Sequence, residues 1–139
     1  MDVTCFSLAS RFVGVKEVAG TASNSLILAM LRLDEPWPQG DEVPWCSAFC
    51  NFICWLLRVP RSKSLAARSW LDIGTPVSVE TAQIGNDIVV LSRDAGGHVG
   101  FYAGHNLHHV ILLGGNQADK VGLAEFPRER VLGVRRLVS

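Results

Sequence analysis

The sequence predicts an α+β fold, in which several helices come first and an antiparallel β-sheet follows. Two observations lead to this prediction. Apolar residues recur at helical spacing in the first half of the chain, most clearly over 46–57. After residue 86 the pattern changes to short β-rich runs that are separated by glycine-containing turns. Helices followed by strands, without alternation, are typical of α+β domains.

Composition and charge exclude several classes of protein. The 139 residues are 48% apolar and 19% charged, which indicates one folded domain over 1–139 rather than a disordered chain. The 13 basic and 13 acidic residues give a formal charge of zero, so the chain lacks the basic surface of a nucleic-acid-binding protein. The longest nearly apolar run, 48–57, is far shorter than the ~20 residues that cross a bilayer. We therefore expect no nucleic-acid partner and no membrane insertion.

The start of the chain lacks the layout of a secretory signal. An acidic residue stands at position 2, and the first basic residue is Arg11. We therefore expect synthesis in the cytoplasm without a signal peptide.

Helices are expected in four places in the first part of the chain. Asp2 or Thr4 could cap the first helix, and Ser23 or Asn24 could cap the second. Prolines and a glycine make 34–44 an expected loop, and Pro60 should stop the third helix. The expected ranges are 4–13, 23–33, 46–57 and 65–71.

Strands are expected in the second part of the chain. Their ranges are 87–91, 98–102, 110–113 and 131–137, and the turns between them are expected at 96–97 and 104–108. Consecutive short strands joined by turns favour an antiparallel sheet, on which the helices can pack.

Cys46 is suited to chemistry because it begins the expected helix over 46–57. The first N–H groups of a helix lack partners within the helix, and the helix dipole favours negative charge there. We therefore expect the pKa of the Cys46 thiol to be lowered toward neutrality, which favours the nucleophilic thiolate. The alternative is that Cys46 is a small buried residue, as we expect for Cys50 and Cys54 on the apolar stripe.

His98 and Asn116 could complete a cysteine hydrolase. His98 opens an expected strand, and Asn116 follows a glycine pair at the end of the next one. A strand start and a neighbouring strand end can bring a base and its orienting residue to the start of a helix. Each residue also has a structural alternative, His98 as an ordinary strand residue and Asn116 as a left-handed turn residue.

The sequence offers no metal or cofactor site. Its cysteines at 46, 50 and 54 are four residues apart on one helix, whereas structural zinc sites use pairs spaced C-x₂-C. No phosphate-binding glycine motif is present. The remaining histidines, which we expect to be solvated hairpin residues, are His105, His108 and His109.

Three motifs contain these candidate residues: Pro44-Trp45-Cys46-Ser47-Ala48-Phe49, Gly97-His98-Val99-Gly100-Phe101 and Leu113-Gly114-Gly115-Asn116-Gln117. Together they resemble the papain-like cell-wall cysteine hydrolases, of the NlpC type and of the cysteine, histidine-dependent amidohydrolase/peptidase (CHAP) type. Segments over 14–18, 22–24, 67–71 and 130–133 extend the resemblance toward a small subfamily of phage and bacterial genomes.

The resemblance implies a papain-like fold, with the catalytic cysteine at a helix N-terminus that packs on the sheet. Cys46 would be the nucleophile, His98 the general base and then the acid, and Asn116 the orienting third residue. The Cys46 backbone N–H and the Gln39 side chain are expected to bind the oxyanion. Residues that are expected to shape a substrate groove are Glu17, Glu42, Trp45 and Trp70.

The function that this resemblance implies is hydrolysis of an amide bond in the peptidoglycan stem peptide, or of the amide that joins muramic acid to L-alanine. We expect a monomeric phage lysis enzyme, or endolysin, that needs no cofactor, is exported by a holin and acts on the cell wall in the periplasm. Three alternatives stay open: an interbacterial effector with an immunity protein, a non-catalytic module that binds wall peptides, and a cytosolic thiol acyltransferase or peptidase.

Overall fold

The structure, a computed structural model, describes residues 3–16, 24–33, 45–93 and 96–138. The α-helices in these ranges are α1 (Cys5–Ala9), α2 (Ser25–Leu31) and α3 (Cys46–Leu57). The strands are β1 (Thr75–Val77), β2 (Asp87–Arg93), β3 (Gly96–His105), β4 (His109–Gln117), β5 (Lys120–Pro127) and β6 (Val131–Arg136). Short 3₁₀-helices are η1 (Ser10–Phe12), η2 (Ala67–Asp72), η3 (Val79–Thr81) and η4 (Arg128–Arg130). Helices therefore precede a sheet, as the sequence predicts.

The first two helices begin at polar caps. The Thr4 hydroxyl accepts a hydrogen bond from the Ser7 N–H, and the Ser7 hydroxyl accepts one from the Thr4 N–H, which forms a capping box at the start of α1. The Asn24 side-chain oxygen accepts from the Leu26 N–H at 2.9 Å and starts α2. Of the alternative caps, Thr4 and Asn24 are thus confirmed.

Helix α3 is the central helix of the core and has the predicted range of 46–57. Most of its residues are buried, and this fits a helix that is apolar on nearly all sides. It ends where Arg58 adopts the left-handed conformation, with a φ of 57°, and donates its backbone N–H to Cys54 and Trp55 carbonyls.

All strands pair in one antiparallel sheet with the order β1-β6-β2-β3-β4-β5. The four predicted strand regions are present, and the structure adds β1 and β5, which the sequence did not predict. The predicted turn at 96–97 is wrong, because Gly96 and Gly97 pair with Arg93 and Ser92 within the sheet.

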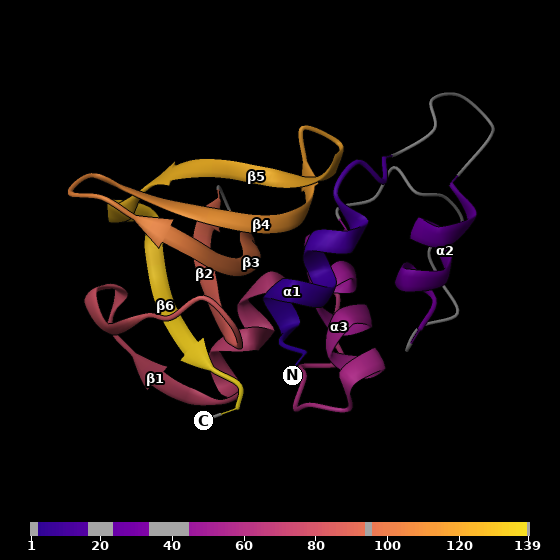
Figure 1. Ribbon diagram of the computed structural model, residues 1–139, viewed down its shortest axis with the longest axis horizontal. Helices are drawn as coiled ribbons and strands as arrows, with labels where there is room; N and C mark the ends of the chain where they lie inside the picture. The colour runs from indigo at the N-terminus through magenta and orange to yellow at the C-terminus, as the bar shows by residue number, and fades with distance from the viewer. Residues whose placement is uncertain (1–2, 17–23, 34–44, 94–95, 139) are drawn as a thin grey trace.

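The sheet separates two apolar clusters. Ile88 and Val90 of β2 face the cluster that contains α1, α2 and α3, whereas Val89 and Leu91 face a second, smaller cluster on the opposite side. This alternation follows from the period of two along a strand. Figure 1 shows the three α-helices gathered on one side of the strands. Within the described residues, no helix is long and apolar enough to cross a membrane.

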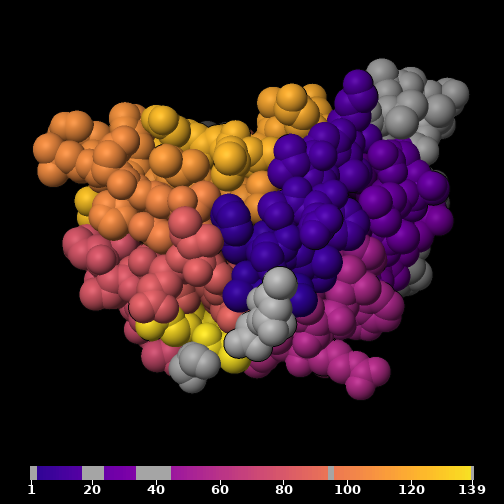
Figure 2. All heavy atoms as spheres, viewed as in Figure 1, coloured from indigo at the N-terminus to yellow at the C-terminus, as the bar shows by residue number. Residues whose placement is uncertain are grey.

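The N-terminal segment also contacts the far edge of the sheet. The Gly14 N–H donates to the Val121 carbonyl at 3.0 Å, and the Val121 N–H donates to the Val15 carbonyl at 2.7 Å. Figure 2 shows this indigo segment beside the turn between β4 and β5. The end of η1 and the β4–β5 hairpin therefore lie side by side.

Candidate active site

Cys46 is the first residue of α3, and a buried polar network fixes this end of the helix. The Ser47 hydroxyl donates to the Ser64 carbonyl at 2.5 Å and accepts a hydrogen bond from the Trp70 indole N–H at 2.8 Å. The Asn51 amide donates to the Ser47 carbonyl at 3.1 Å. Because the Ser47, Asn51 and Trp70 side chains are buried and hydrogen-bonded, they fix the position of the first turn of α3, and of Cys46 with it.

The Cys46 thiol lies against the sheet and is only 3% exposed. Burial, the largest effect, raises the pKa of Cys46 above the ordinary thiol value of 9.0. The backbone N–H groups of Val99, Ser47 and Cys46, together with the charge of Arg93, favour the thiolate but do not outweigh burial. The predicted lowering of this pKa is therefore wrong for the free protein, in which the group is a neutral thiol.

The contact with Val99 brings Cys46 to the strand that carries His98. The Val99 N–H faces the thiol, and His98 is the preceding residue on β3. The His98 side chain is fully buried, and its ring packs on Phe126 with a centroid separation of 5.1 Å. The structure thus brings the start of α3 and the start of β3 together, as the sequence predicts for these two candidate residues.

Gln117 holds the His98 ring. The His98 Nε2 and the Gln117 Oε1 are 2.9 Å apart. The Gln117 amide nitrogen donates to the carbonyls of Leu112 at 3.1 Å and Gly122 at 2.6 Å, so the amide oxygen must be the atom that faces the ring. An oxygen can only accept, and therefore Nε2 carries the proton.

This assignment leaves the His98 Nδ1 as a bare lone pair. Nδ1 is buried and has no hydrogen-bond partner among the residues that the structure describes. Burial also lowers the pKa of His98 to about 4, with smaller contributions in the same direction from Arg93 and Arg130, although the bond to Gln117 opposes them. At neutral pH the ring is therefore an uncharged base with one free acceptor atom.

A β-bulge in β4 selects Gln117 as the residue that faces His98. Gly114 pairs with Gly122 and Gln117 with Lys120, so Gly115 and Asn116 lie opposite the single residue Val121. An extra residue in one strand re-aims the side chains that follow it. Asn116 has a φ of 57° and forms no side-chain hydrogen bond with the described part of the chain. The bond that the sequence assigns to Asn116 is made by the next residue.

Two glycines make room for this arrangement. A Cβ at position 114 would lie 2.7 Å from the Gln117 Oε1, and a Cβ at position 115 would lie 2.7 Å from the Trp45 ring. The Gly-Gly pair before Asn116 therefore has a steric role, because it admits the orienting amide on one side and the residue before Cys46 on the other.

Several predicted site residues do not form a groove. Trp45 and Trp70 are both fully buried, Trp45 against Gly115 and Trp70 with its indole N–H on Ser47, so neither can contact a substrate here. The assignment of these two residues to a substrate groove is therefore wrong. The other proposed groove and oxyanion residues, Glu17, Gln39 and Glu42, lie outside the described residues.

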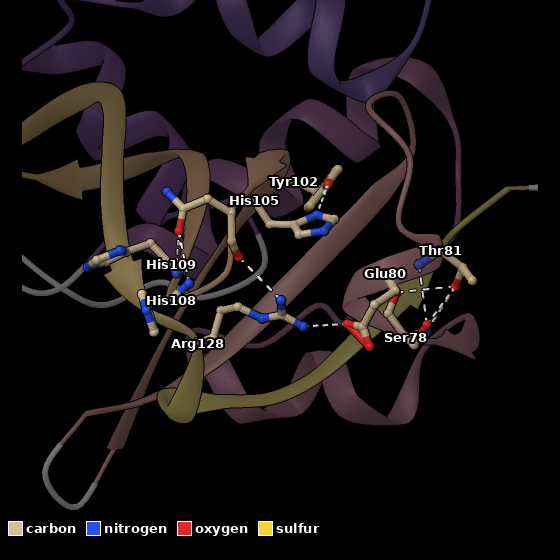
Figure 3. Close-up of polar contacts among 9 residues, drawn as sticks. Ser78, Glu80, Thr81, Tyr102, His105, His108, His109 and Arg128 are labelled. Carbon is tan, nitrogen blue, oxygen red and sulfur yellow. Dashed lines mark hydrogen bonds and ion pairs between the residues drawn. The ribbon is translucent and has the colours of Figure 1, made fainter.

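The remaining histidines lie at the opposite end of β3. The β3–β4 turn contains His108, and His105 accepts or donates a 2.6 Å hydrogen bond with the Tyr102 hydroxyl. Figure 3 shows Arg128 joining this hairpin to Glu80 through an ion pair. His105 lies seven residue positions after His98 along β3, which corresponds to about 23 Å of extended strand. These histidines therefore take no part in the site at Cys46.

Between residues 3 and 138, outside the gaps, no three histidine, cysteine or acidic side chains are grouped as metal ligands. The four cysteines are buried free thiols. What the site does contain is a thiol at a helix start, an oriented neutral imidazole and N–H groups that face the sulfur, which are the parts of a thiol nucleophile with its base.

Comparison with solved structures identifies the fold. NlpC1 from Trichomonas vaginalis aligns with a TM-score of 0.59 and 16% identity over 96% of this chain, and this chain spans only 42% of that protein. The P60 domain of an antigen from M. avium subspecies paratuberculosis aligns with a TM-score of 0.58 and 14% identity, over 97% of this chain and 96% of that one. No family model and no curated protein matches the sequence. The chain therefore has the papain-like α+β fold of NlpC/P60 domains.

Proposed function

We propose that this chain is a cysteine hydrolase that cleaves an amide bond in the peptidoglycan stem peptide. The observation that carries the proposal is the fixed orientation of His98. Its Nε2–H is bound by Gln117, which leaves Nδ1 free, and the next residue on the strand contacts the Cys46 thiol. A neutral thiol needs a base that takes its proton. The hydrogen bond from His98 Nε2 to Gln117 leaves Nδ1 as the atom that can do so.

The reaction starts from an uncharged pair. When the substrate carbonyl approaches, the thiol proton passes to the His98 Nδ1 while the sulfur forms a bond to the carbonyl carbon. The backbone N–H of Cys46, at the start of α3, is a donor for the oxygen that becomes negative. The imidazolium then gives its proton to the leaving amine as the C–N bond breaks. A water molecule then gives a proton to the His98 Nδ1 and attacks the acyl-enzyme carbonyl. The C–S bond breaks, the sulfur takes the proton back, and the carboxylic acid product leaves.

Gln117 is the third residue of this proposal, in the place that the sequence suggested for Asn116. It fixes the ring rotation and the tautomer, and it stabilises the proton on Nε2 throughout the cycle. Its own amide is held by two backbone carbonyls, so it cannot rotate to present its nitrogen without losing both bonds.

Purified wall sacculi test the activity. Wild-type protein should release soluble muropeptides, whereas Cys46→Ala should release none and should keep the wild-type unfolding temperature. Cys50→Ala is the matched control, because it removes a buried thiol from the same helix, one turn further on. Turnover by a folded Cys46→Ala protein would exclude the nucleophile, and inactive wild-type protein would exclude this substrate.

Mass spectrometry of the products identifies the bond. A new free amino group within the stem indicates an endopeptidase, and a glycan strand without peptide indicates an amidase. As the setting we propose a phage lysis enzyme. Co-expression with a holin in a Gram-negative host should then cause lysis, and an interbacterial effector would instead be neutralised by a neighbouring immunity protein.

A further inference from the structure

Three of the four buried thiols lie together in the core, away from the candidate active site. Cys5 belongs to α1, whereas Cys50 and Cys54 are one turn apart on α3. Cys54 lies eight residues after Cys46, which corresponds to about 12 Å along the helix. The mechanism proposed for Cys46 and His98 gives these three thiols no role.

The segment that contains Cys5 packs directly on α3, as Figure 1 shows for α1. The Phe12 ring makes edge-on contacts with Phe49 and Phe52, with centroid separations of 6.1 and 5.8 Å. At the start of α1 the Cys5 N–H donates to the Asn86 side-chain oxygen at 3.0 Å. These contacts at both ends fix the position of α1 over α3.

The sulfur atoms of Cys5 and Cys54 meet at this interface. The Cys54 thiol donates a hydrogen bond to the Cys5 sulfur, which lowers the pKa of Cys5 and raises the pKa of Cys54. Cys50 interacts with both residues through charge and not through a hydrogen bond. Sulfur atoms that are already in contact are the geometry from which a disulfide can form.

A hollow of about 330 Å³ lies at the end of α3, and Cys54 is among its lining residues. Arg58 and Arg61 also line it, and the Arg61 charge acts on the Cys54 thiol. Because Cys5 and Cys54 are both 0% exposed, a reagent reaches their sulfur atoms only when this end of the core opens locally. The two arginines favour a small anionic reagent at that place.

We propose that Cys5 and Cys54 form a disulfide when the protein is in an oxidising compartment, and that this bond fastens α1 to α3. The oxidant is a low-molecular-weight anionic disulfide such as oxidised glutathione. The bond closes the chain between residues 5 and 54 and stabilises the fold, because it restricts the unfolded chain. The inference does not depend on the proposed hydrolase function.

The oxidation is a thiol–disulfide exchange in two steps. The Cys5 thiolate attacks one sulfur of oxidised glutathione, the S–S bond of glutathione breaks, and one glutathione leaves with the proton that Cys5 released. Cys54 then loses its proton and attacks the Cys5 sulfur of the mixed disulfide, and the second glutathione leaves with that proton. The two cysteine thiols lose two electrons, and one glutathione disulfide is reduced to two thiols.

Peptide mapping of wild-type protein locates the bond. Cleavage after arginine and lysine leaves Cys5 in peptide 1–11 and the other three cysteines in peptide 33–58. Folded protein that is equilibrated with oxidised glutathione and then alkylated should yield these two peptides joined, and fragment spectra should assign the bond to Cys54. A bond to Cys46 or Cys50, alkylated thiols at both positions, or glutathione retained on Cys5 would each overturn the inference.

Unfolding temperatures measure what the bond does. The variant Cys46→Ala/Cys50→Ala keeps only Cys5 and Cys54, and oxidation should raise its unfolding temperature by roughly 5–15 °C. Cys46→Ala/Cys54→Ala is the matched control, because it also keeps two cysteines and should show no change on the same treatment. An equal rise in both variants, or a joined protein that unfolds no higher than its reduced form, would contradict the proposal.

The wild-type map needs no substitution, so it decides the question even where a double variant does not fold. It is also independent of hydrolysis. Protein that forms the bond between Cys5 and Cys54 but releases no muropeptides from sacculi would retain this inference and exclude the proposed function. Active protein without the bond would do the opposite.

Discussion

The chemistry of the site depends on a single amide. Gln117 decides which nitrogen of His98 carries the proton, and thereby which one can accept the proton of Cys46. Because two hydrogen bonds to backbone carbonyls fix the Gln117 amide, the fold and not the solvent determines which His98 nitrogen is protonated. At the residue scale, the proposed catalysis therefore depends on a buried amide whose hydrogen bonds are all formed.

Gln117→Ala should lower kcat by roughly tenfold to a hundredfold. The change leaves the Nε2–H of His98 buried without an acceptor, and such a loss costs about 1–3 kcal/mol. Asn116→Gly is the matched control, since glycine tolerates the φ of 57° at that position. We expect near wild-type kcat on wall fragments for this control. Loss of activity in Asn116→Gly with full activity in Gln117→Ala would restore the original assignment.

The partner of His98 shows how much of the candidate site could be predicted from the sequence. Cys46 and His98 were predicted from a helix start and a strand start, and the structure brings these two element starts together. The side chain that binds the His98 ring lies one position after Asn116, because a bulge shifts the side chains that follow it and alternation alone cannot locate a bulge. The pair Gly114–Gly115 just before it was the available signal.

His98 should make stability depend on pH. Its pKa is about 4 in the folded protein against an ordinary value of 6.5, so the unfolded chain binds a proton between these values and the folded chain does not. Stability is therefore fully present above pH 6.5 and falls as the pH falls toward 4, by about 3 kcal/mol. Urea unfolding at several pH values measures this loss.

His98→Gln is the control for the pH experiment. It removes the titrating ring, so its unfolding free energy should lose the part of the pH dependence that lies between 4 and 6.5. If the unfolding free energies of wild-type and His98→Gln protein change in parallel with pH, the buried ring does not contribute to the pH dependence of stability.

At the scale of elements, α3 and β4 meet without an intervening side chain. Gly115 lies directly on Trp45 and Phe49, and this contact brings the helix start close to the sheet. The sequence predicted α3 at its observed limits, because twelve residues of continuous helical pattern end at a proline. Long, strongly apolar elements are the ones that such patterns define best.

Strand β5 illustrates an element that local pattern could not reveal. Its sequence contains lysine, glycine and glutamate, and the two-residue turn before it is Ala118-Asp119, both with positive φ. Such turns usually carry asparagine or glycine, so the usual hairpin signal is absent. Pairing with β4 and the contact with the N-terminal segment stabilise a strand that has weak local preference.

Gly115→Ala should destabilise the protein by roughly 1–3 kcal/mol or more. The new Cβ would lie 2.7 Å from the Trp45 ring and 2.8 Å from the Phe49 Cβ, and neither neighbour has space to move in a packed core. Gly122→Ala is the matched control on the paired strand, because nothing lies within 4 Å of its added methyl group. Its unfolding temperature should be unchanged or slightly higher. Equal unfolding temperatures for the two variants would contradict this packing.

At the scale of the whole molecule, residues 85–87 join both ends of the chain. The Cys5 N–H donates to the Asn86 side chain at 3.0 Å, and the Leu137 N–H donates to the Asn86 carbonyl at 2.9 Å. Strand β6, the last in sequence, lies between β1 and β2 within the sheet. The sheet that carries His98 is therefore complete only when the last strand has been inserted.

The ion pair between Asp87 and Arg136 should stabilise β6 in its place between β1 and β2. The Arg136 Nε and Nη2 atoms each lie 2.9 Å from an oxygen of the Asp87 carboxylate, which is 2% exposed. Arg136→Leu leaves this buried carboxylate with the Gln83 N–H alone, and should lower the midpoint of chemical denaturation clearly more than Arg128→Leu does. The double variant Asp87→Leu/Arg136→Leu should recover most of the loss, because no charge is then left unpaired. Arg128→Leu breaks the exposed pair with Glu80 and should cost no more than about 1 kcal/mol. If Arg136→Leu is as mild as Arg128→Leu, the closure of the sheet must depend on its backbone pairing instead.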